Sequence, residues 1–383
     1  MNIRDEVREF LASAWTPGMD SATFLQAAVD TGWLAPTWSA DWYGRGLSAE
    51  DAEIVGEEFR RVGAPGRADR DHLHARVIYE LGSDQLKSTY LRDLLTHTVS
   101  GCLLYSEPGA GSDLASVRTS VVREGDQWRV NGQKVWTSGA RTAAYGLLAA
   151  RSNRDVPKHR GMTFFVIPMK QEGIEVRPLV QITGDAHFNE VFFTDAWVDD
   201  ANRLGEVDDG WRVLMTALGY ERLVMGARGV GSRASDPTYV GTGDDLLALA
   251  ERHGRLEDPV IADQIADIYA ERTAARLNAA RYAAEGKGQD AAAMSLGKLM
   301  MSRILHGTAG LRRDIVGAEA LYDERADPPS DGEVANFFTL DAYFTSIGGG
   351  TDQVQRNIIS ERMLGLPKDK DASKDIPFRD VRS

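Results

Sequence analysis

The hydrophobic pattern of the chain changes its period twice, and this change limits the fold more than any other feature. Up to residue 99, apolar residues recur every three or four positions, which is typical of amphipathic helices. Short alternating runs typical of strands follow over 100–205, and the helical period then returns. A chain of 383 residues also exceeds what one core usually covers. We therefore predict a helical domain over 1–99, an antiparallel β-domain over 100–205 and a helical domain over 206–367.

The middle segment contains several short runs with strand character, at 117–123, 128–130, 134–137, 147–151, 162–168, 174–177 and 190–194. Between the second and third runs lies Asn131-Gly132, a dipeptide favoured in two-residue hairpin turns because both residues tolerate positive φ. We therefore predict a hairpin at this point, within an antiparallel sandwich or barrel.

The C-terminal region contains three long amphipathic runs, at 211–232, 259–285 and 291–313, which predict helices. The residues after Pro367 are charged and poor in apolar side chains. We expect 368–383 to be a mobile tail, or a segment laid across a partner.

Composition excludes several classes of protein. No apolar run approaches the roughly 18–20 residues of a membrane span, and the N-terminus resembles neither a signal peptide nor a transit peptide. The net charge of −13 argues against a nucleic-acid or anionic-membrane binder. The single cysteine, Cys102, fits a cytoplasmic protein without disulfides. The seven histidines are scattered, so we expect no metal site.

Two segments of the β-domain have residues suited to a cofactor. Leu103–Asp113 ends a strand in a loop with two glycines, a proline and hydroxyl side chains, where backbone N–H groups can approach a phosphate or a flat ring. In the second segment, Trp136 precedes Thr137 and Ser138 at a strand end, and could wall a planar cofactor. A plain β-turn and a core tryptophan are the alternative interpretations.

Glu221 is the most unusual carboxylate of the C-terminal region. The apolar face of its predicted helix consists of Leu214, Ala217, Leu218, Val224 and Met225, and Glu221 interrupts it. An unpaired carboxylate there is costly, and its removal from water suits a general base. An ion pair with Arg222, Arg228 or another subunit is the alternative.

The fourth segment runs from Ser346 to Asn357 and contains three consecutive glycines before a short amphipathic run. Thr351 and Gln353 lie at the predicted helix N-terminus, which favours anions. The alternative is a flexible linker before the last helix.

Together and in this order, the four segments resemble those of the acyl-CoA dehydrogenase flavoprotein family. The most specific parts are Ser106-Glu107-Pro108-Gly109-Ala110-Gly111-Ser112-Asp113 and the Gly350–Asn357 stretch, and the likeness reaches Pro367. The resemblance implies an α+β multidomain fold with an N-terminal helical domain, a middle antiparallel β-domain and a C-terminal four-helix bundle. It also implies FAD between the last two domains, with its adenine end at a neighbouring subunit.

The resemblance assigns roles to individual residues. FAD would be bound by Leu103, Tyr105, Ser106, Gly111, Ser112, Trp136, Thr137, Ser138, Thr351 and Gln353. Within this set, Trp136 would cover the flavin ring, Ser138 would bond near N5 and Thr351 would hold the adenosine part. The acyl thioester would contact Ser112, Tyr220, Arg222 and Gly350.

The sequence departs from the common family pattern at the catalytic glutamate. Many members carry that glutamate immediately before the Gly-Thr of the fourth segment, where this chain has Gly349 after Gly348. The isovaleryl-CoA type instead places the base on a helix, in a Glu-Arg pair like Glu221-Arg222. The resemblance therefore nominates Glu221 as the base and leaves the Gly349 N–H to polarise the thioester oxygen.

Two further segments are altered, 250–255 and 314–320. Both contact the FAD of an adjacent subunit in the family, so a symmetric homotetramer is in doubt. We expect a dimer-based homo- or hetero-oligomer.

These features predict an FAD-dependent α,β-dehydrogenation of an acyl-CoA thioester to the 2,3-enoyl-CoA, with an electron-transferring flavoprotein as acceptor. The alternatives are an FAD-binding or half-catalytic subunit of a heteromeric dehydrogenase and, less strongly supported, a flavin oxygenase. Because Gly348 and Gly349 replace two large side chains, we expect room for a branched or bulky acyl group. The opposing interpretation is that Phe344 fills this space.

Overall fold

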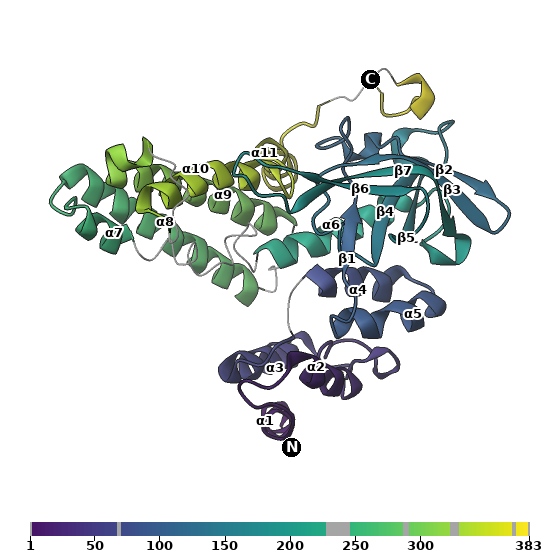
Figure 1. Ribbon diagram of the computed structural model, residues 1–383, viewed down its shortest axis with the longest axis horizontal. Helices are drawn as coiled ribbons and strands as arrows, with labels where there is room; N and C mark the ends of the chain where they lie inside the picture. The colour runs from purple at the N-terminus through teal and green to yellow at the C-terminus, as the bar shows by residue number, and fades with distance from the viewer. Residues whose placement is uncertain are drawn as a thin grey trace. The chain divides into compact units, whose positions relative to one another are not determined.

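The computed structural model describes residues 2–66, 70–226, 246–285, 291–321, 329–369 and 373–381 (Figure 1). Two compact units divide the chain. Unit 1 consists of Met1–Leu179, His187–Val224 and Ala372–Ser383, and unit 2 of Val180–Ala186 and Met225–Asp371. The predicted order of helical, β and helical regions is confirmed.

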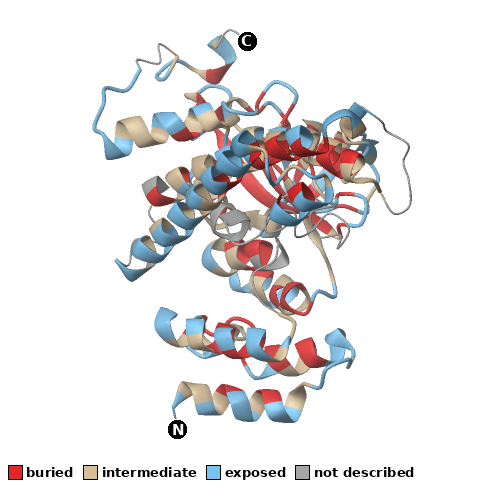
Figure 2. Ribbon diagram, turned by 90° about the vertical axis from the view of Figure 1, so that its left-hand side faces the viewer, coloured by how far each residue is buried: buried red, intermediate tan, exposed pale blue. Residues whose placement is uncertain are grey.

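Unit 1 begins with five helices: α1 (Ile3–Ala14), α2 (Ser21–Asp30), α3 (Ala49–Val62), α4 (Arg70–Leu81) and α5 (Asp84–Leu95). Helices α3 and α5 begin directly after Ser48 and Ser83, which accept a hydrogen bond from the backbone N–H three residues later. Buried and exposed residues alternate along these helices, as expected of amphipathic segments (Figure 2).

An eight-stranded sheet follows, in the order β6-β7-β3-β2-β4-β5-β8 with β1 paired to β4. Its strands are β1 (Gly101–Leu104), β2 (Ser120–Glu124), β3 (Gln127–Lys134), β4 (Tyr145–Arg151), β5 (Met162–Pro168), β6 (Ile174–Leu179), β7 (Phe188–Asp199) and β8 (Arg203–Leu204). Most pairs are antiparallel as predicted, but β1 and β2 each pair with β4 in parallel. Since β1 comes from the helical region and not from a hairpin, it can align with β4 in either direction.

The predicted hairpin at Asn131-Gly132 is wrong. Strand β3 continues through both residues, and the hairpin instead joins β2 to β3. Gly132 has a φ of 148° at a register shift between β3 and β7, and a Cβ there would lie 2.6 Å from the Thr119 Cα. The glycine therefore serves a bulge and a close backbone approach, not a turn.

One hydrophobic core joins the N-terminal helices to the sheet. It includes Phe24 and Phe59 from the helices, Phe164 from β5, and Leu214 and Ala217 from α6 (Gly210–Gly226). Along β4, alternate residues enter this core and a second core on the opposite face of the sheet. Helix α6 is therefore packed in the same interior as β1 and β5.

Over 373–381, the C-terminal tail differs from the prediction that 368–383 is mobile. Phe378 is buried, and the Arg151 guanidinium carbon lies 4.0 Å from its ring centroid. The backbone N–H of Phe378 donates to the Val156 carbonyl at 2.9 Å, and Arg379 pairs with Asp155 at 2.9 Å. Phe378 and Arg379 thus dock a tail whose other residues are mostly polar.

Unit 2 is helical, with α7 (Leu246–Arg252), α8 (Pro259–Ala284), α9 (Ala291–Val316), α10 (Asp331–Ile347) and α11 (Asp352–Ile358). Helix α9 packs against each of the other four. No described helix is long and apolar enough to cross a membrane.

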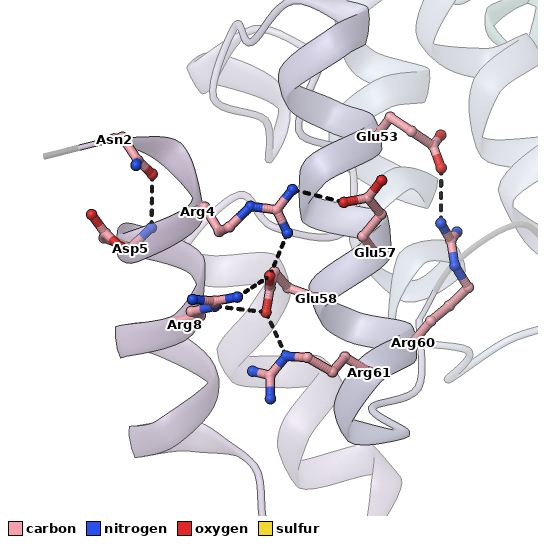
Figure 3. A network of polar contacts seen from close by, with 9 residues as sticks. All are labelled: Asn2, Arg4, Asp5, Arg8, Glu53, Glu57, Glu58, Arg60 and Arg61. Carbon is pink, nitrogen blue, oxygen red and sulfur yellow. Dashed lines mark hydrogen bonds and ion pairs between the residues drawn. The ribbon is translucent and has the colours of Figure 1, made fainter.

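A buried carboxylate joins α1 to α3 within unit 1. The Glu58 side chain is 1% exposed and accepts hydrogen bonds from Arg4 at 2.6 Å, Arg8 at 2.9 Å and Arg61 at 2.7 Å (Figure 3). The hydrogen bond from Arg8, with those from Arg61 and Arg4, lowers the pKa of Glu58 from 4.5 to about 2 against the effect of burial.

This pKa makes the attachment of α1 sensitive to acid. Because the folded-state pKa is depressed, the stabilisation is complete above pH 4.5 and is lost as the pH falls through about 2. We expect Glu58→Gln to lower the Tm by roughly 2–4 °C at pH 7, and the difference from wild type to shrink in this acid range. Glu57→Gln is the control, because Glu57 is half exposed and pairs only with Arg4 in the described chain. Equal Tm values for the three proteins at pH 7 would contradict this account.

Candidate active site

The loop after β1 is anchored by a buried ion pair. The Lys134 ammonium, which is fully buried, donates to Glu107 Oε1 at 2.7 Å and to the Tyr105 carbonyl at 3.0 Å. The Glu107 carboxylate also accepts from the backbone N–H groups of Arg118 at 2.6 Å and Thr119 at 2.9 Å. These bonds hold both sides of the loop against β3.

The same loop makes a tight turn at its tip. Glu107 and Ala110 exchange two backbone hydrogen bonds, at 3.1 and 3.0 Å. At Gly109 and Gly111 a Cβ atom would have no neighbour within 4 Å, so both glycines face open space. Burial opposes ionisation of Glu107, but the Lys134 charge and the N–H donors lower its pKa overall. The tip of the loop therefore exposes its backbone, and the Glu107 carboxylate beneath it holds the loop in place.

The second predicted segment lies beside this loop. Val135 donates its N–H to the Ser106 carbonyl at 3.0 Å, and Thr137 and Asn189 exchange backbone hydrogen bonds at 3.0 Å. Between these anchors Trp136 adopts a φ of 62° and is 55% exposed, with its ring edge-on to Phe188 at 5.7 Å. A tryptophan held in the left-handed region costs about 1–3 kcal/mol, and such strain is commonly found at functional sites.

The hydroxyl groups of this segment differ in environment. Ser138 and Ser106 are half-buried, Ser112 is exposed and Thr137 is fully buried. The Thr137 hydroxyl has no hydrogen-bond partner among the described residues. The residues predicted to contact a flavin in unit 1 are thus brought together around the ends of β1 and β3.

Helix α6 begins at a fixed point on β5. Asp208 has a φ of 66°, and its carboxylate accepts from Ser152 at 2.5 Å and Asn153 at 3.1 Å. A Cβ at Gly210 would lie 2.8 Å from the Met162 backbone, so only glycine lets the helix start this close to the strand. These contacts set the direction in which α6 carries Glu221.

Glu221 is half-buried and lies one turn beyond Ala217 on the buried face of α6. Tyr105, at the end of β1, is buried in the same core. Burial raises the pKa of Tyr105 well above its usual value, and the negative charge of Glu221 raises it further. The predicted base directly follows Tyr220, which, like Leu218, packs against the core that contains Tyr105.

The neighbours of Glu221 in the sequence are described only in part. Tyr220 is half-buried, and the Arg76 guanidinium carbon lies 4.9 Å from its ring centroid. Arg222 lies on α6, but its side chain falls outside the described residues, as does Arg228. An ion pair between Glu221 and either of these arginines therefore stays a prediction.

In unit 2, the triple glycine links α10 to α11. Gly349 and Gly350 have φ values of 65° and 84°, a conformation that favours glycine. The Gln355 amide donates to the Gly349 carbonyl at 3.1 Å, and Thr351 accepts from the Val354 N–H at 3.2 Å as the N-cap of α11. Thr351 thus caps its own helix, whereas Gln353 is exposed.

The space beside Gly348 is already occupied within unit 2. A Cβ atom at Gly348 would lie 3.1 Å from two ring carbons of Phe344. This position agrees with the opposing interpretation of the sequence, in which Phe344 fills the gap. The geometry at Gly348 consequently gives no support to an enlarged pocket.

Family models match the chain over nearly its whole length. They describe an acyl-CoA dehydrogenase N-terminal domain at residues 1–98, a middle domain at 102–196 and a C-terminal domain at 208–364. Acyl-CoA dehydrogenase IpdE1 of Mycobacterium tuberculosis is 35% identical over 340 residues, which cover 87% of this chain and 84% of that protein. The chain belongs to the acyl-CoA dehydrogenase family.

Solved structures agree with this assignment. The ChsE4-ChsE5 complex from Mycobacterium tuberculosis has a chain that is 29% identical, with a TM-score of 0.72 and coverage of 96% of this chain and 97% of that one. The Tcur3481-Tcur3483 steroid ACAD gives 25% identity and a TM-score of 0.74, with coverage of 96% and 97%. This acyl-CoA dehydrogenase is therefore an FAD-dependent oxidoreductase that acts on an acyl-CoA.

The residues present in unit 1 fit the flavin of an acyl-CoA dehydrogenase. The exposed ring of Trp136 offers a flat apolar wall, and the half-buried Ser106 and Ser138 offer hydroxyl donors. The open space at Gly109 and Gly111 lets backbone N–H groups approach a phosphate. Among the described residues, no group of three or more His, Cys, Asp and Glu side chains is placed to hold a metal ion.

Three supporting residues of this acyl-CoA dehydrogenase were not predicted from the sequence. Lys134 and Asn189 anchor the two segments that are predicted to bind flavin, and Asp208 fixes the start of α6. None of the three carries a local signal in the sequence, because their partners lie 27, 52 and 56 residues away.

Removing one member of the Glu107–Lys134 pair should destabilise the enzyme and release FAD. Glu107→Gln leaves the fully buried Lys134 ammonium without a counter-charge, which costs about 3–5 kcal/mol for a broken buried pair. We expect a lower urea midpoint and a lower FAD-to-protein absorbance ratio. The double variant Glu107→Gln/Lys134→Met should recover much of the stability, because no charge remains buried.

Glu175→Gln is the matched control on the same sheet, because Glu175 pairs with Arg177 at the surface. Its urea midpoint and FAD content should equal those of wild type. A Glu107→Gln protein that also matches wild type would show that the ion pair does not hold the loop.

Proposed function

We propose that Glu221 is the general base that removes the α-proton of the acyl-CoA. The observation that carries this proposal is the position of Glu221 on the face of α6 whose Leu214 and Ala217 are buried in the core that also contains Tyr105. Bound FAD would supply the acceptor for the β-hydride. The product is the 2,3-enoyl-CoA.

The fourth segment supports this choice of base. Gly349 stands where many family members carry their catalytic glutamate, and its φ of 65° is one that larger residues rarely adopt. A backbone N–H at this position is still available to stabilise negative charge on the thioester oxygen as the α-proton leaves. In this proposal one residue of α6 holds the proton, and the Gly349 backbone stabilises the developing charge.

Replacing Glu221 tests the assignment directly. Glu221→Gln keeps the shape of the side chain but cannot accept the proton. We expect FAD to stay bound and anaerobic flavin reduction by substrate to slow by at least about 10²-fold, the lower range for a positioned general base. Stopped-flow absorbance measures the rate.

Glu206→Gln is the control, because the Glu206 side chain is 86% exposed in the segment that precedes α6. Reduction at the wild-type rate in both variants would remove Glu221 from the mechanism.

We further propose that the acyl group is branched or bulky and carries rings. The name of the Tcur3481-Tcur3483 steroid ACAD, together with its likeness over nearly the whole chain, supports a ring-bearing thioester. The small residues at 348–350 remain compatible with such a substrate, although Phe344 occupies the space beside Gly348. The support therefore comes mainly from the relatives.

Steady-state comparison of thioesters tests this specificity. We expect kcat/KM for ring-bearing or α-branched acyl-CoA esters to exceed that for butyryl-, octanoyl- and palmitoyl-CoA by at least about 10-fold, the range reached by apolar pocket contacts. A straight-chain ester that surpasses every branched and cyclic ester would refute the proposal.

A second candidate function is that of one subunit in a heteromeric dehydrogenase. The two altered segments that would reach a neighbour's FAD are instead tied to their own unit, where Arg255 donates to the Asp314 carbonyl at 3.0 Å and Asn336 to the Ala320 carbonyl at 2.8 Å. The ChsE4-ChsE5 complex, with two differently named chains, also favours it. FAD that binds only after coexpression with a second subunit would distinguish this candidate from a homomeric enzyme.

An electron acceptor and a cellular location complete the proposal. An electron-transferring flavoprotein would accept the electrons, as expected for this family. The lone Cys102 is buried and needs no oxidising compartment, in keeping with our expectation of a cytoplasmic enzyme.

A further inference from the structure

Arg151, the last residue of β4, carries a buried charge that the proposed function does not use. The residue is 1% exposed. Within the described chain, the hydrogen bonds that its guanidinium donates all go to backbone carbonyls, those of Ala115 at 2.5 Å, Val117 at 3.3 Å and Lys158 at 2.6 Å. Burial lowers the pKa of Arg151 to about 10, so the group is still charged at pH 7. One buried cation thus holds two segments of the chain together.

The first of these segments closely follows the glycine loop of the candidate site. Ser112, in that loop, is predicted to contact both FAD and the acyl thioester. The next residue, Asp113, accepts hydrogen bonds from the Lys158 ammonium at 2.8 Å and the Ser116 hydroxyl at 2.5 Å. Arg151 holds the chain beside both partners of this ion pair. The position of Ser112 therefore depends on Arg151.

The C-terminal tail covers the Arg151 guanidinium. The guanidinium carbon lies 4.0 Å from the centroid of the Phe378 ring, within the range of a cation–π contact. Phe378 is 5% exposed and is the one buried residue of the described tail, 373–381. Its backbone N–H donates to the Val156 carbonyl at 2.9 Å, which fixes the ring in place. After unit 2 the chain thus returns to unit 1, and its one buried residue there lies on Arg151.

The Phe378 ring protects the hydrogen bonds that Arg151 donates. An aromatic face attracts a cation but leaves its N–H donors to the carbonyls, whereas water would compete for those donors. A guanidinium open to water would therefore hold the carbonyls of Ala115 and Val117 less firmly. The effect of the tail thus reaches the segment that follows Ser112.

We propose that the C-terminal tail completes the FAD site, because Phe378 seals Arg151 from water and so holds the segment that positions Ser112. The inference rests on the proposed function only in that Ser112 contacts FAD, and it does not involve the base. Phe378 is then a positioning residue, since it acts on the cofactor through Arg151 and the glycine loop.

Phe378→Ala in the full-length, FAD-loaded enzyme tests this role, with any second subunit that the enzyme needs. Flavin fluorescence measures the rate of FAD release without substrate, and hydrogen exchange with mass spectrometry measures the protection of 113–119. We expect FAD release to become at least about 10-fold faster, as for loss of a desolvated cation–π contact, and 113–119 to exchange faster.

Two conservative variants separate the aromatic face from simple bulk. Phe378→Tyr keeps the ring and should release FAD at the wild-type rate. Phe378→Leu keeps apolar cover without the ring, so its rate should lie between those of wild type and Phe378→Ala. If Phe378→Ala cannot be purified with FAD, the Phe378→Leu enzyme carries the test with the same two measurements.

Arg379→Gln is the matched control on the same tail, because it removes an exposed ion pair with Asp155 and leaves Phe378 on Arg151. Both measurements should equal those of wild type. Wild-type FAD release in Phe378→Ala would overturn the inference, even if 373–381 exchanges faster, because the tail would then dock without supporting the site. A normal rate of flavin reduction in Glu221→Gln would remove the proposed base and leave this inference in place.

Discussion

The buried ion pair between Glu107 and Lys134 is the interaction on which the rest of the site depends. Strand β2 lies between the two residues in the sequence, yet the pair joins the loop after β1 to the end of β3. Lys134 directly precedes Val135 and Trp136, so the same contact sets the position of the exposed tryptophan. Replacing charges with apolar residues is often neutral for stability, so the value of the pair lies in fixing one geometry for two segments.

The second constraint is the start of α6. Asp208 binds Ser152 just after β4, and Gly210 lies against Met162 on β5. Helix α6 then carries Glu221 on the face whose apolar residues pack in the core that contains Tyr105. A base on a helix packed into the core is held more rigidly than one on a loop. The glycines at 348–350 turn the chain between α10 and α11 and offer no side chain there that could serve as a base.

Periodicity predicted the order of the domains because amphipathic faces are local properties. The long helices α6, α8 and α9 begin near the expected residues, and α8 and α9 also end near them. The expected end of the first long helix, at residue 232, lies outside the described residues. Local signals failed where a distant contact decides the conformation. Gly132 serves the close approach of Thr119 and not a turn, and Phe378 docks the tail on Arg151. The sequence predicted Glu221 as an anomalous carboxylate, but not Asp208, which fixes the start of its helix and whose partner Ser152 lies 56 residues earlier.

The central claim is that Glu221 exchanges a proton with the α-carbon of the bound thioester. Incubating the FAD-loaded enzyme in D₂O with a substrate analogue that cannot lose its β-hydride isolates this step, and mass spectrometry detects deuterium at Cα. The account predicts that wild type incorporates deuterium at Cα and that Glu221→Gln does not. Equal incorporation by the two proteins would contradict it.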